Sequence, residues 1–214
     1  MGRNRTQTAN DCRRATALTG AGMSIFDANT QWANTLVYNL AAAGVTQVVV
    51  SPGSRNTPLV LACDRCPQLN IEVVLDERAA AFVALGMSRV SGTPTALVCT
   101  SGSACAHYLP AIIEARYSRI PLIVLSADRP AELHNCGAPQ TINQEQIFGK
   151  HVVASFELKA PNAGEANINE AAALAVQAVR MATGSPQGPV HLNLPFRKPM
   201  WEASQGERSF VPHI

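Results

Sequence analysis

The sequence is poor in charged residues and has no apolar run long enough to cross a membrane. Asp, Glu, Lys and Arg make up only 15% of the 214 residues, whereas hydrophobic residues make up 47%. A membrane-spanning helix needs about 20 consecutive apolar residues. The net charge is +2 and the body of the chain has no cluster of Lys and Arg, so nothing indicates nucleic-acid binding. What remains is a globular chain of the length of one α/β domain, with ample apolar residues for a core.

Two glycine-rich signatures of nucleotide binding are also absent. The loop Ser51-Pro52-Gly53-Ser54-Arg55 follows an apolar run at 45–50 and precedes a predicted helix with Pro58 in its first turn. The loop offers small residues, exposed backbone N–H groups and one guanidinium. However, the chain contains neither G-x-G-x-x-G nor G-x-x-x-x-G-K-[ST], so neither nucleotide-binding type is supported.

Patterns that bind metal ions are sparse as well. Cys63 and Cys66 form a C-x-x-C, but no second pair and no cluster of His accompanies them. The pair is either a zinc or redox site or, as we prefer, two positions on a buried helical turn. His107, His134 and His191 have no partner pattern and are interpreted as structural. We predict no metal ligand in this chain, and its cysteine usage indicates a reduced, cytoplasmic protein.

The first 22 residues differ in composition from the rest. They contain four Arg and a single acidic residue, Asp11, which weakly resembles a transit peptide and keeps an organellar location open. An upstream start or an artificial extension would explain them equally well, and Met23 is an alternative start. We predict a leader at 1–22, one domain at 23–200, and a tail or linker at 201–214.

Apolar, β-branched runs alternate with helical patterns along the domain. We predict strands at 45–50, 73–75, 95–99, 121–126, 152–158 and 190–194, and helices at 30–43, 58–66, 79–90, 104–117 and 167–181. Asn29 or Thr30 is expected to cap the first helix. The alternation predicts a three-layer α/β/α fold with a mainly parallel sheet. The long irregular segment at 131–150 is typical of functional loops.

The stretch from Ile71 to Val90 is unusual because a predicted buried strand passes directly into an Ala-rich helix, also predicted to be buried. Glu77 lies at that junction. Its carboxylate either suits the positive end of the helix dipole or is a catalytic group.

The strand ends carry the polar residues of the domain. Arg55, Glu77, Thr100-Ser101 and Arg129 each follow a predicted strand. Right-handed crossovers place the carboxyl ends of parallel strands at one edge of the sheet. One carboxylate, two guanidiniums and several hydroxyls should therefore gather there. That set suits an anionic small molecule, with one acid available for proton chemistry.

These loops also carry a resemblance to a known family. The segment Gly188 to Pro195 and Glu77 with its Ala-rich helix, followed by Gly86, Gly92, Pro94 and Thr100-Ser101-Gly102, resemble the pyrimidine-binding domain of thiamine-diphosphate enzymes. More specific motifs resemble the MenD family, the SEPHCHC synthases of menaquinone and phylloquinone synthesis. These motifs are Ser51-Pro52-Gly53-Ser54-Arg55, Asp76-Glu77-Arg78, Ala127-Asp128-Arg129-Pro130 with Glu132-Leu133, and Cys136-Gly137-Ala138 with Gln140-Thr141-Ile142.

The resemblance implies a thiamine-diphosphate-dependent transferase. The family decarboxylates 2-oxoglutarate and adds the resulting carbanion to isochorismate. Matched by motif, Glu77 would hydrogen-bond the pyrimidine ring nitrogen and favour the imino tautomer of the cofactor, which removes the thiazolium proton. Thr100 and Ser101 are interpreted as turn and cap residues close to the cofactor.

The same resemblance assigns the substrate carboxylates to Arg55 and Arg129, with Ser54 and Gln140 as neighbouring polar contacts. Each has a simpler reading from the residues alone: an ion pair for either arginine, a turn or helix cap for Ser54, and an ordinary loop position for Gln140. Pro139 departs from the family, which more often has a polar residue there, and it stiffens the loop.

The family also needs a second domain that this sequence does not contain. That domain holds Mg²⁺ through a GDG motif and a downstream Asn, and no GDG occurs here. In the family, sites form between subunits of homodimers or homotetramers, so we expect this chain to supply half a site and to be inactive alone. The alternative is a non-catalytic α/β module that binds a carboxylate effector or assembles with a partner chain. A third reading, a relative of acetolactate synthase, is disfavoured by the Ser54-Arg55 and Asp128-Arg129-Pro130 motifs.

Overall fold

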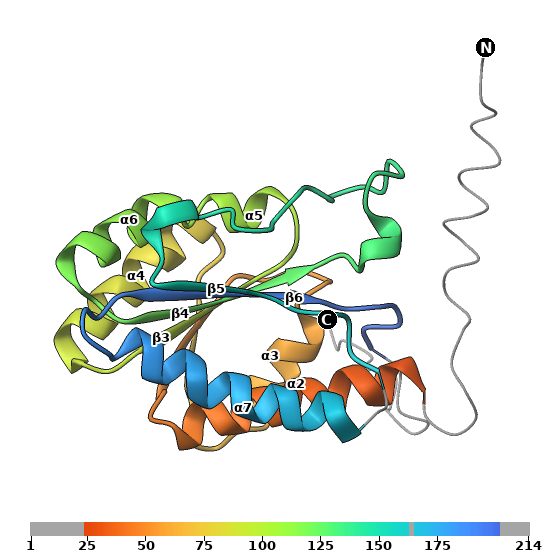
Figure 1. Ribbon diagram of the computed structural model, residues 1–214, viewed down its shortest axis with the longest axis horizontal. Coiled ribbons are helices and arrows are strands. Elements are labelled where there is room, and N and C mark those ends of the chain that lie inside the picture. Colours follow the sequence, from red (N-terminus) through yellow and green to blue (C-terminus); the bar gives the residue numbers. More distant parts are fainter. Residues whose placement is uncertain (1–23, 163–164, 202–214) are drawn as a thin grey trace, which may run out of the picture.

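The computed structural model describes residues 24–162 and 165–201, which form a six-stranded sheet with helices on both faces (Figure 1). The strand order is β2-β1-β3-β4-β6-β5, and every neighbouring pair runs parallel. The predicted three-layer α/β/α fold is therefore confirmed. The predicted leader at 1–22, and the predicted tail from residue 202 onward, lie outside the described residues. Within the described ranges, no helix is long and apolar enough to cross a membrane.

The elements alternate along the chain as predicted, although several bounds differ. The strands are β1 (Gln47–Val50), β2 (Asn70–Val73), β3 (Thr95–Cys99), β4 (Leu122–Asp128), β5 (Ala154–Glu157) and β6 (Pro189–Pro195). The α-helices are α2 (Ile25–Ala42), α3 (Thr57–Asp64), α4 (Glu77–Ser91), α5 (Ser103–Ala106), α6 (Leu109–Ser118) and α7 (Glu165–Ala182). Two short 3-10 helices, η1 (Ala131–Leu133) and η2 (Gly149–His151), lie in the otherwise irregular segment before β5.

The sheet separates two hydrophobic cores. Helices α2, α3 and α7 cover one face, where Val48, Val98 and Leu192 are buried. Helices α4, α5 and α6 cover the other face, where Val49 and Leu97 are buried (Figure 1). Successive residues of a strand point to opposite faces. The central strands are therefore apolar nearly throughout, as expected for a sheet covered on both sides.

Helix α2 begins earlier than predicted, because Ser24 rather than Asn29 or Thr30 caps it. The Ser24 hydroxyl accepts the N–H of Asp27 at 3.1 Å, and the Asp27 carboxylate accepts the N–H of Ser24, so the two form a capping box. Asn29 is instead buried inside the helix, where its side-chain amide donates to the carbonyl of Arg197 at 2.8 Å. This bond ties α2 to the chain that follows β6.

The prediction of a buried strand before Glu77 is wrong. Strand β2 is an edge strand that pairs only with β1, and Val73 and Leu75 are 60% and 77% exposed. Helix α4 is likewise buried on one side only, since Phe82 and Val90 are exposed on the other. An apolar, β-branched run indicates contact with other apolar surface, but it does not say whether that surface belongs to the same chain.

The helix predicted at 104–117 is two helices, α5 and α6. Gly102 precedes α5 with φ +88°, a left-handed conformation that favours glycine. Tyr108 lies between the two helices, and Pro110 occupies the first turn of α6, where its missing N–H is tolerated.

Helices α4 and α6 pack against one another and on the sheet through the smallest apolar side chains. Ala80, Ala81 and Ala84 of α4 and Ala111 and Ala115 of α6 are all fully buried. An Ala side chain ends at Cβ, so the layer beneath the start of α4 is thin and close-packed.

Candidate functional site

The polar loops predicted to meet do meet at the carboxyl edge of the sheet. Arg55 follows β1, Glu77 follows β2, Thr100-Ser101 follows β3 and Arg129 follows β4. Strands β2, β1, β3 and β4 are consecutive neighbours in the sheet and all run parallel. The gathering of these residues on one edge is therefore confirmed, whereas their roles remain predictions.

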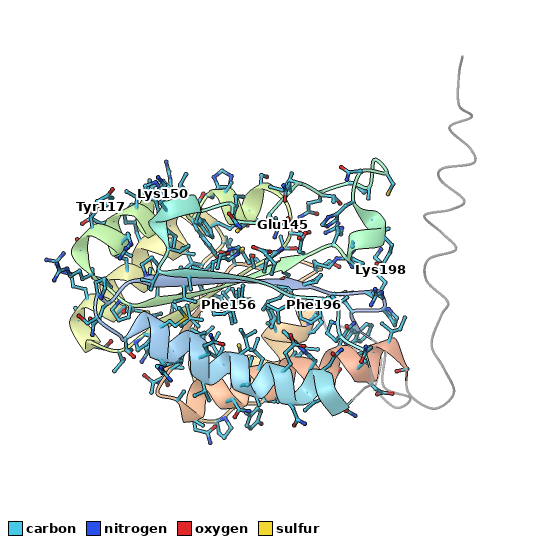
Figure 2. All side chains as sticks on the ribbon, in the orientation of Figure 1. Tyr117, Glu145, Lys150, Phe156, Phe196 and Lys198 are labelled. Atoms are coloured by element: carbon cyan, nitrogen blue, oxygen red, sulfur yellow. The ribbon has the colours of Figure 1, made fainter. Side chains whose placement is uncertain are left out.

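Arg55 is the most buried cation at this edge. The residue is only 4% exposed, and its Nη1 donates to the carbonyl of Phe196 at 2.7 Å. Figure 2 shows Phe196 at the end of the sheet, on the side covered by α2 and α7. Burial, and then repulsion from Arg129, lower the pKa of Arg55 to about 10, while Asp128 opposes the change. The two guanidiniums are therefore close enough to repel one another.

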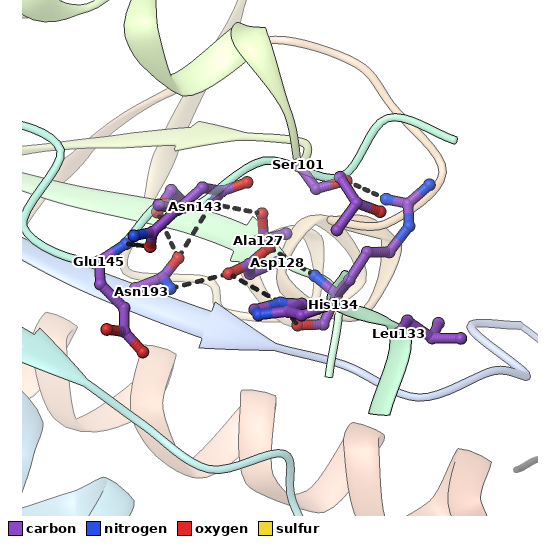
Figure 3. Close-up of polar contacts among 12 residues, drawn as sticks. Ser101, Ala127, Asp128, Leu133, His134, Asn143, Glu145 and Asn193 are labelled. Carbon is purple, nitrogen blue, oxygen red and sulfur yellow. Dashed lines mark hydrogen bonds and ion pairs between the residues drawn. The ribbon is translucent and has the colours of Figure 1, made fainter. Parts of the chain in front are cut away.

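Arg129 reaches across the end of β3. Its Nη1 donates to the hydroxyl of Ser101 (Figure 3). Burial lowers the pKa of Arg129, and the neighbouring carboxylate of Asp128 counteracts this. In the part of the chain that the structure describes, the salt bridges join Arg197 to Glu132 and His134 to Asp128. Neither Arg55 nor Arg129 has a carboxylate partner there, so the ion-pair interpretation of these arginines finds no support.

Glu77 is the first residue of α4, and it is half-buried. The helix is capped by Asp76, whose carboxylate accepts the N–H of Ala79 at 2.8 Å. The Glu77 carboxylate makes no hydrogen bond or salt bridge with any described residue. Its charge reaches the interior, where it adds to burial and to Cys105 in raising the pKa of the Cys99 thiol. Capping does not occupy Glu77, so its carboxylate is available to a ligand.

Gly53 and Thr100 bring the loops after β1 and β3 together. The hydroxyl of Thr100 accepts the backbone N–H of Arg55 at 3.4 Å. A Cβ at Gly53 would lie 2.3 Å from the Cβ of Thr100, so only glycine allows this approach. Ser54 is exposed, and its carbonyl accepts the hydroxyl of Thr57 at 2.9 Å. The structure thus gives Ser54 a place in the turn before α3 and leaves its side chain open to solvent.

Gln140 joins the irregular segment to the same edge. Its side-chain amide donates to the carbonyl of Ser101 at 3.1 Å, and its backbone adopts φ +58°. Gly102 lies directly beneath it, where a Cβ would be 3.0 Å from Cγ of Gln140. Pro139 precedes it and is exposed. The structure therefore brings Gln140 and Arg129 together on Ser101.

Two residues that the motifs do not single out, Gln144 and Asn193, connect the site to the sheet. Gln144 is fully buried, and its amide nitrogen donates to the carbonyl of Ala127 at 3.2 Å and to Oδ1 of Asn193 at 2.9 Å. Asn193 donates in turn to the carboxylate of Asp128 at 2.9 Å (Figure 3). Burial raises the pKa of Asp128. The sequence signal for Asn193 is an amide in a strand that is apolar apart from His191.

Metal-binding geometry does not occur in the described ranges 24–162 and 165–201, where no cluster of three His, Cys, Asp or Glu could hold an ion. His191 is buried, hydrogen-bonds Ser126 at 2.7 Å and packs edge-on against Phe148. His134 hydrogen-bonds the carbonyl of Arg129 at 2.9 Å. Both contacts suit the structural role predicted for these histidines.

Comparison with known proteins agrees with the geometry of this edge. Residues 30–147 match the family described as thiamine pyrophosphate enzyme, N-terminal TPP binding domain. The chain is 47% identical over 188 residues to the 2-succinyl-5-enolpyruvyl-6-hydroxy-3-cyclohexene-1-carboxylate synthase of Geobacillus kaustophilus, covering 88% of this chain and 31% of that protein. The synthases of Chloroflexus aurantiacus (51% over 174 residues, 81% of this chain and 29% of that protein) and Haloquadratum walsbyi (48% over 178 residues, 83% and 29%) are similarly related.

The chain thus spans about 30% of the length of the curated relatives it matches. The fold, the free carboxylate at the start of α4 and the matched residues lead to one assignment: this chain belongs to the thiamine pyrophosphate enzyme family, as an N-terminal TPP-binding domain.

Proposed function

We propose that the chain forms the pyrimidine-binding part of a SEPHCHC synthase of menaquinone biosynthesis. Such an enzyme is a thiamine-diphosphate-dependent transferase that decarboxylates 2-oxoglutarate and adds the succinyl unit to isochorismate, releasing CO2. The observation that carries the proposal is a pair of guanidiniums without carboxylate partners, Arg55 and Arg129, on the same sheet edge as the free carboxylate of Glu77. The names of the relatives supply the reaction.

Glu77 fits the pyrimidine end of the cofactor. The bound cofactor supplies an electron sink for decarboxylation and carbon–carbon bond formation. A half-buried carboxylate that neither caps its helix nor meets a cation can accept a hydrogen bond from a ring nitrogen or share a proton with it. Glu77 is thus proposed to hold that proton, with Thr100 and Ser101 beside the ring.

Arg55 and Arg129 fit the carboxylates of the two substrates. Charge-assisted hydrogen bonds of guanidinium to carboxylate are worth about 1.5–3 kcal/mol each. Their mutual repulsion and partial burial leave both cations ready to gain from an incoming anion. Ser54 and Gln140 are proposed as neighbouring polar contacts, and Ser54 is exposed at the rim where a substrate would enter.

The remaining parts of the active site are proposed to come from other protein. We propose that a diphosphate-binding domain supplies the ligands of Mg²⁺, and that the enzyme is a homodimer or homotetramer. The exposed apolar side chains of Val73 and Leu75 just before Glu77, and of Phe82 and Val90 along α4, support a subunit contact on this side of the domain. The thiols of Cys63, Cys66, Cys99 and Cys105 are buried and form no disulfide, which supports a reduced, cytoplasmic location.

A chimera tests this proposal directly. Residues 24–201 would replace the matching segment of the Geobacillus kaustophilus synthase, and SEPHCHC formation would be measured with both substrates, thiamine diphosphate and Mg²⁺. We expect activity in the chimera, none in the present chain alone, and a loss of at least about a hundredfold for Glu77→Gln, which keeps the shape but cannot hold the proton. A folded, cofactor-loaded chimera without activity, or one indifferent to Glu77→Gln, would refute the proposal.

The alternative is a non-catalytic module that binds a carboxylate effector through the same two arginines. Calorimetry separates the two. If the chain binds a dicarboxylate, and its affinity stays the same when the rest of the Geobacillus kaustophilus synthase is supplied, the result favours an effector site. Binding that tightens when that protein and the cofactor are supplied favours half of an active site.

A further inference from the structure

Three side chains of the candidate site converge on one peptide, Ser101-Gly102, at the end of β3. The hydroxyl of Ser101 accepts a hydrogen bond from Arg129, and the carbonyl of Ser101 accepts one from the side-chain amide of Gln140. The N–H of Gly102 donates to Oε1 of Gln144 at 2.8 Å. The positions of Arg129 and Gln140 therefore depend on where this peptide is held.

Gln144 continues the connection and closes it into a ring. Its amide nitrogen donates to Asn193, Asn193 donates to Oδ2 of Asp128, and Oδ1 of Asp128 accepts the backbone N–H of Arg129 at 2.7 Å. Arg129 then returns to Ser101 through its side chain. We call this closed circuit, formed by Ser101-Gly102, Gln144, Asn193, Asp128 and Arg129, the polar ring. Figure 3 shows its labelled members Ser101, Asp128 and Asn193 around the ends of the strands.

Apart from the half-buried Arg129, the polar ring is buried, and both polar atoms of the Gln144 side chain are hydrogen-bonded. Gln144 is 0% exposed, and Asn193 and Asp128 are nearly so. Buried polar groups need partners, and each bond is stronger where water is excluded. A planar group that accepts on one side and donates twice on the other is required at this position, since Gly102 offers an N–H while Ala127 and Asn193 offer oxygens. Of the ordinary side chains of this length, only Gln meets that requirement.

We propose that Gln144 is a positioning residue, which fixes the Arg129 guanidinium and the side chain of Gln140 against Ser101. Gln144 lies four residues after Gln140 in the irregular segment, whose backbone has few regular hydrogen bonds of its own. The amide of Gln144 therefore sets the register of that segment on the sheet edge. Its use in holding a dicarboxylate rests on the function proposed above, whereas its hold on Arg129 does not.

The test compares the 214-residue chain with its Gln144→Met variant and with Gln146→Met as a control. Gln146 is exposed in the same segment, so the control makes the same chemical change outside the polar ring. The Arg129 Nε–Hε signal would be identified by its loss in Arg129→Lys, and hydrogen exchange would be followed there and at the Gly102 amide. We expect exchange at both to quicken about tenfold or more in Gln144→Met, the size expected for one lost hydrogen bond, and to stay unchanged in the control.

Gln144→Glu is the second variant, in case Gln144→Met does not fold. Its carboxylate keeps an acceptor for Gly102 but loses the donor to Asn193. We therefore expect the Gly102 amide to stay protected while the Arg129 signal shifts. Unchanged Arg129 and Gly102 signals in a folded Gln144 variant would overturn the proposal.

Kinetics in the chimera separates positioning from stability alone. We expect Gln144→Met to raise the KM for the dicarboxylate substrates about tenfold with a smaller change in kcat, because the ring holds substrate contacts and not Glu77. A lower melting temperature with KM unchanged would overturn the positioning role. If the Arg129 signals change in the Gln144 variants but the chain binds no dicarboxylate, the proposed function is refuted. The conclusion that the polar ring positions Arg129 is then still supported.

Discussion

Replacing Arg55 with Met tests whether this buried cation is a structural partner or is held ready for a ligand. Burial and repulsion lower its pKa from 12.5 to about 10. At about 1.4 kcal/mol per pKa unit, the charged form costs the fold at most about 3.5 kcal/mol. The guanidinium borders the open sheet edge, and screening by solvent reduces this to roughly 1.5 kcal/mol.

The substitution also has a cost of similar size. The carbonyl of Phe196 loses the hydrogen bond from Nη1, at about 1 kcal/mol. The two effects nearly cancel, so the free energy of unfolding of Arg55→Met should lie within about 1 kcal/mol of the wild type. Removing one partner of a buried salt bridge would instead cost about 3–5 kcal/mol, because the other charge would be left unpaired.

Urea unfolding followed by circular dichroism measures this difference, with Arg180→Met on the exposed side of α7 as a control for the loss of one charge. Calorimetry with 2-oxoglutarate or isochorismate follows on the same proteins. We expect Arg55→Met, and not Arg180→Met, to weaken binding about tenfold or more. A loss of 3 kcal/mol or more of stability, with binding intact, would show that Arg55 is a structural ion-pair partner and refute our reasoning.

Three further outcomes follow from other parts of the structure. Gly53→Ala should cost about 1–3 kcal/mol of unfolding free energy, because its Cβ meets the side chain of Thr100 from Cβ outward. Thr100→Gly in the same chain removes those atoms and should recover part of the loss, and an additive double mutant in urea unfolding would contradict the contact. Burial raises the pKa of the Asp128 carboxyl. Protonated Asp128 should therefore stabilise the fold below the unfolded pKa of about 3.8, and this stabilisation should be lost as pH rises through the folded pKa. The unfolding free energies of wild type and Asp128→Asn, measured with urea across this range, should converge toward low pH, and divergence there would oppose the assignment. Leu75→Glu should leave the unfolding free energy of the chain within about 0.5 kcal/mol while weakening self-association of the chimera in analytical ultracentrifugation. An unaffected oligomer would argue against a subunit contact through the segment between β2 and α4.

The architecture could be predicted from sequence because its signals are local and repeated. Most strands of the sheet are short apolar runs, β1, β2, β3 and β5 are each followed by an α-helix, and parallel pairing brings the ends of the strands to one edge. The gathering of Arg55, Glu77, Ser101 and Arg129 at that edge follows from topology alone. Their spacing in the sequence carries no such information.

Two features could not be predicted, for different physical reasons. Burial of Val73 and Leu75 was inferred from their apolar character, which indicates a contact but not the chain that provides it. Gln144 and Asn193 are single amides that belong to no periodic pattern. Their importance depends on hydrogen bonds between distant parts of the chain: Gln144 and Asn193 are 49 positions apart, and Gly102 and Gln144 are 42 positions apart. The early start of α2 could have been read from Ser24 and Asp27, whose spacing is that of a capping box.

The Ala-rich layer under α4 limits how this protein can change over time. A side chain that ends at Cβ cannot shift aside, so a single added methyl at Ala80, Ala81 or Ala84 has to move the whole helix. Glu77 is the first residue of that helix and would move with it. Substitutions that leave every polar group of the site untouched can thus displace its one free carboxylate, and the sequence of this layer is constrained by the chemistry above it as well as by the packing within it.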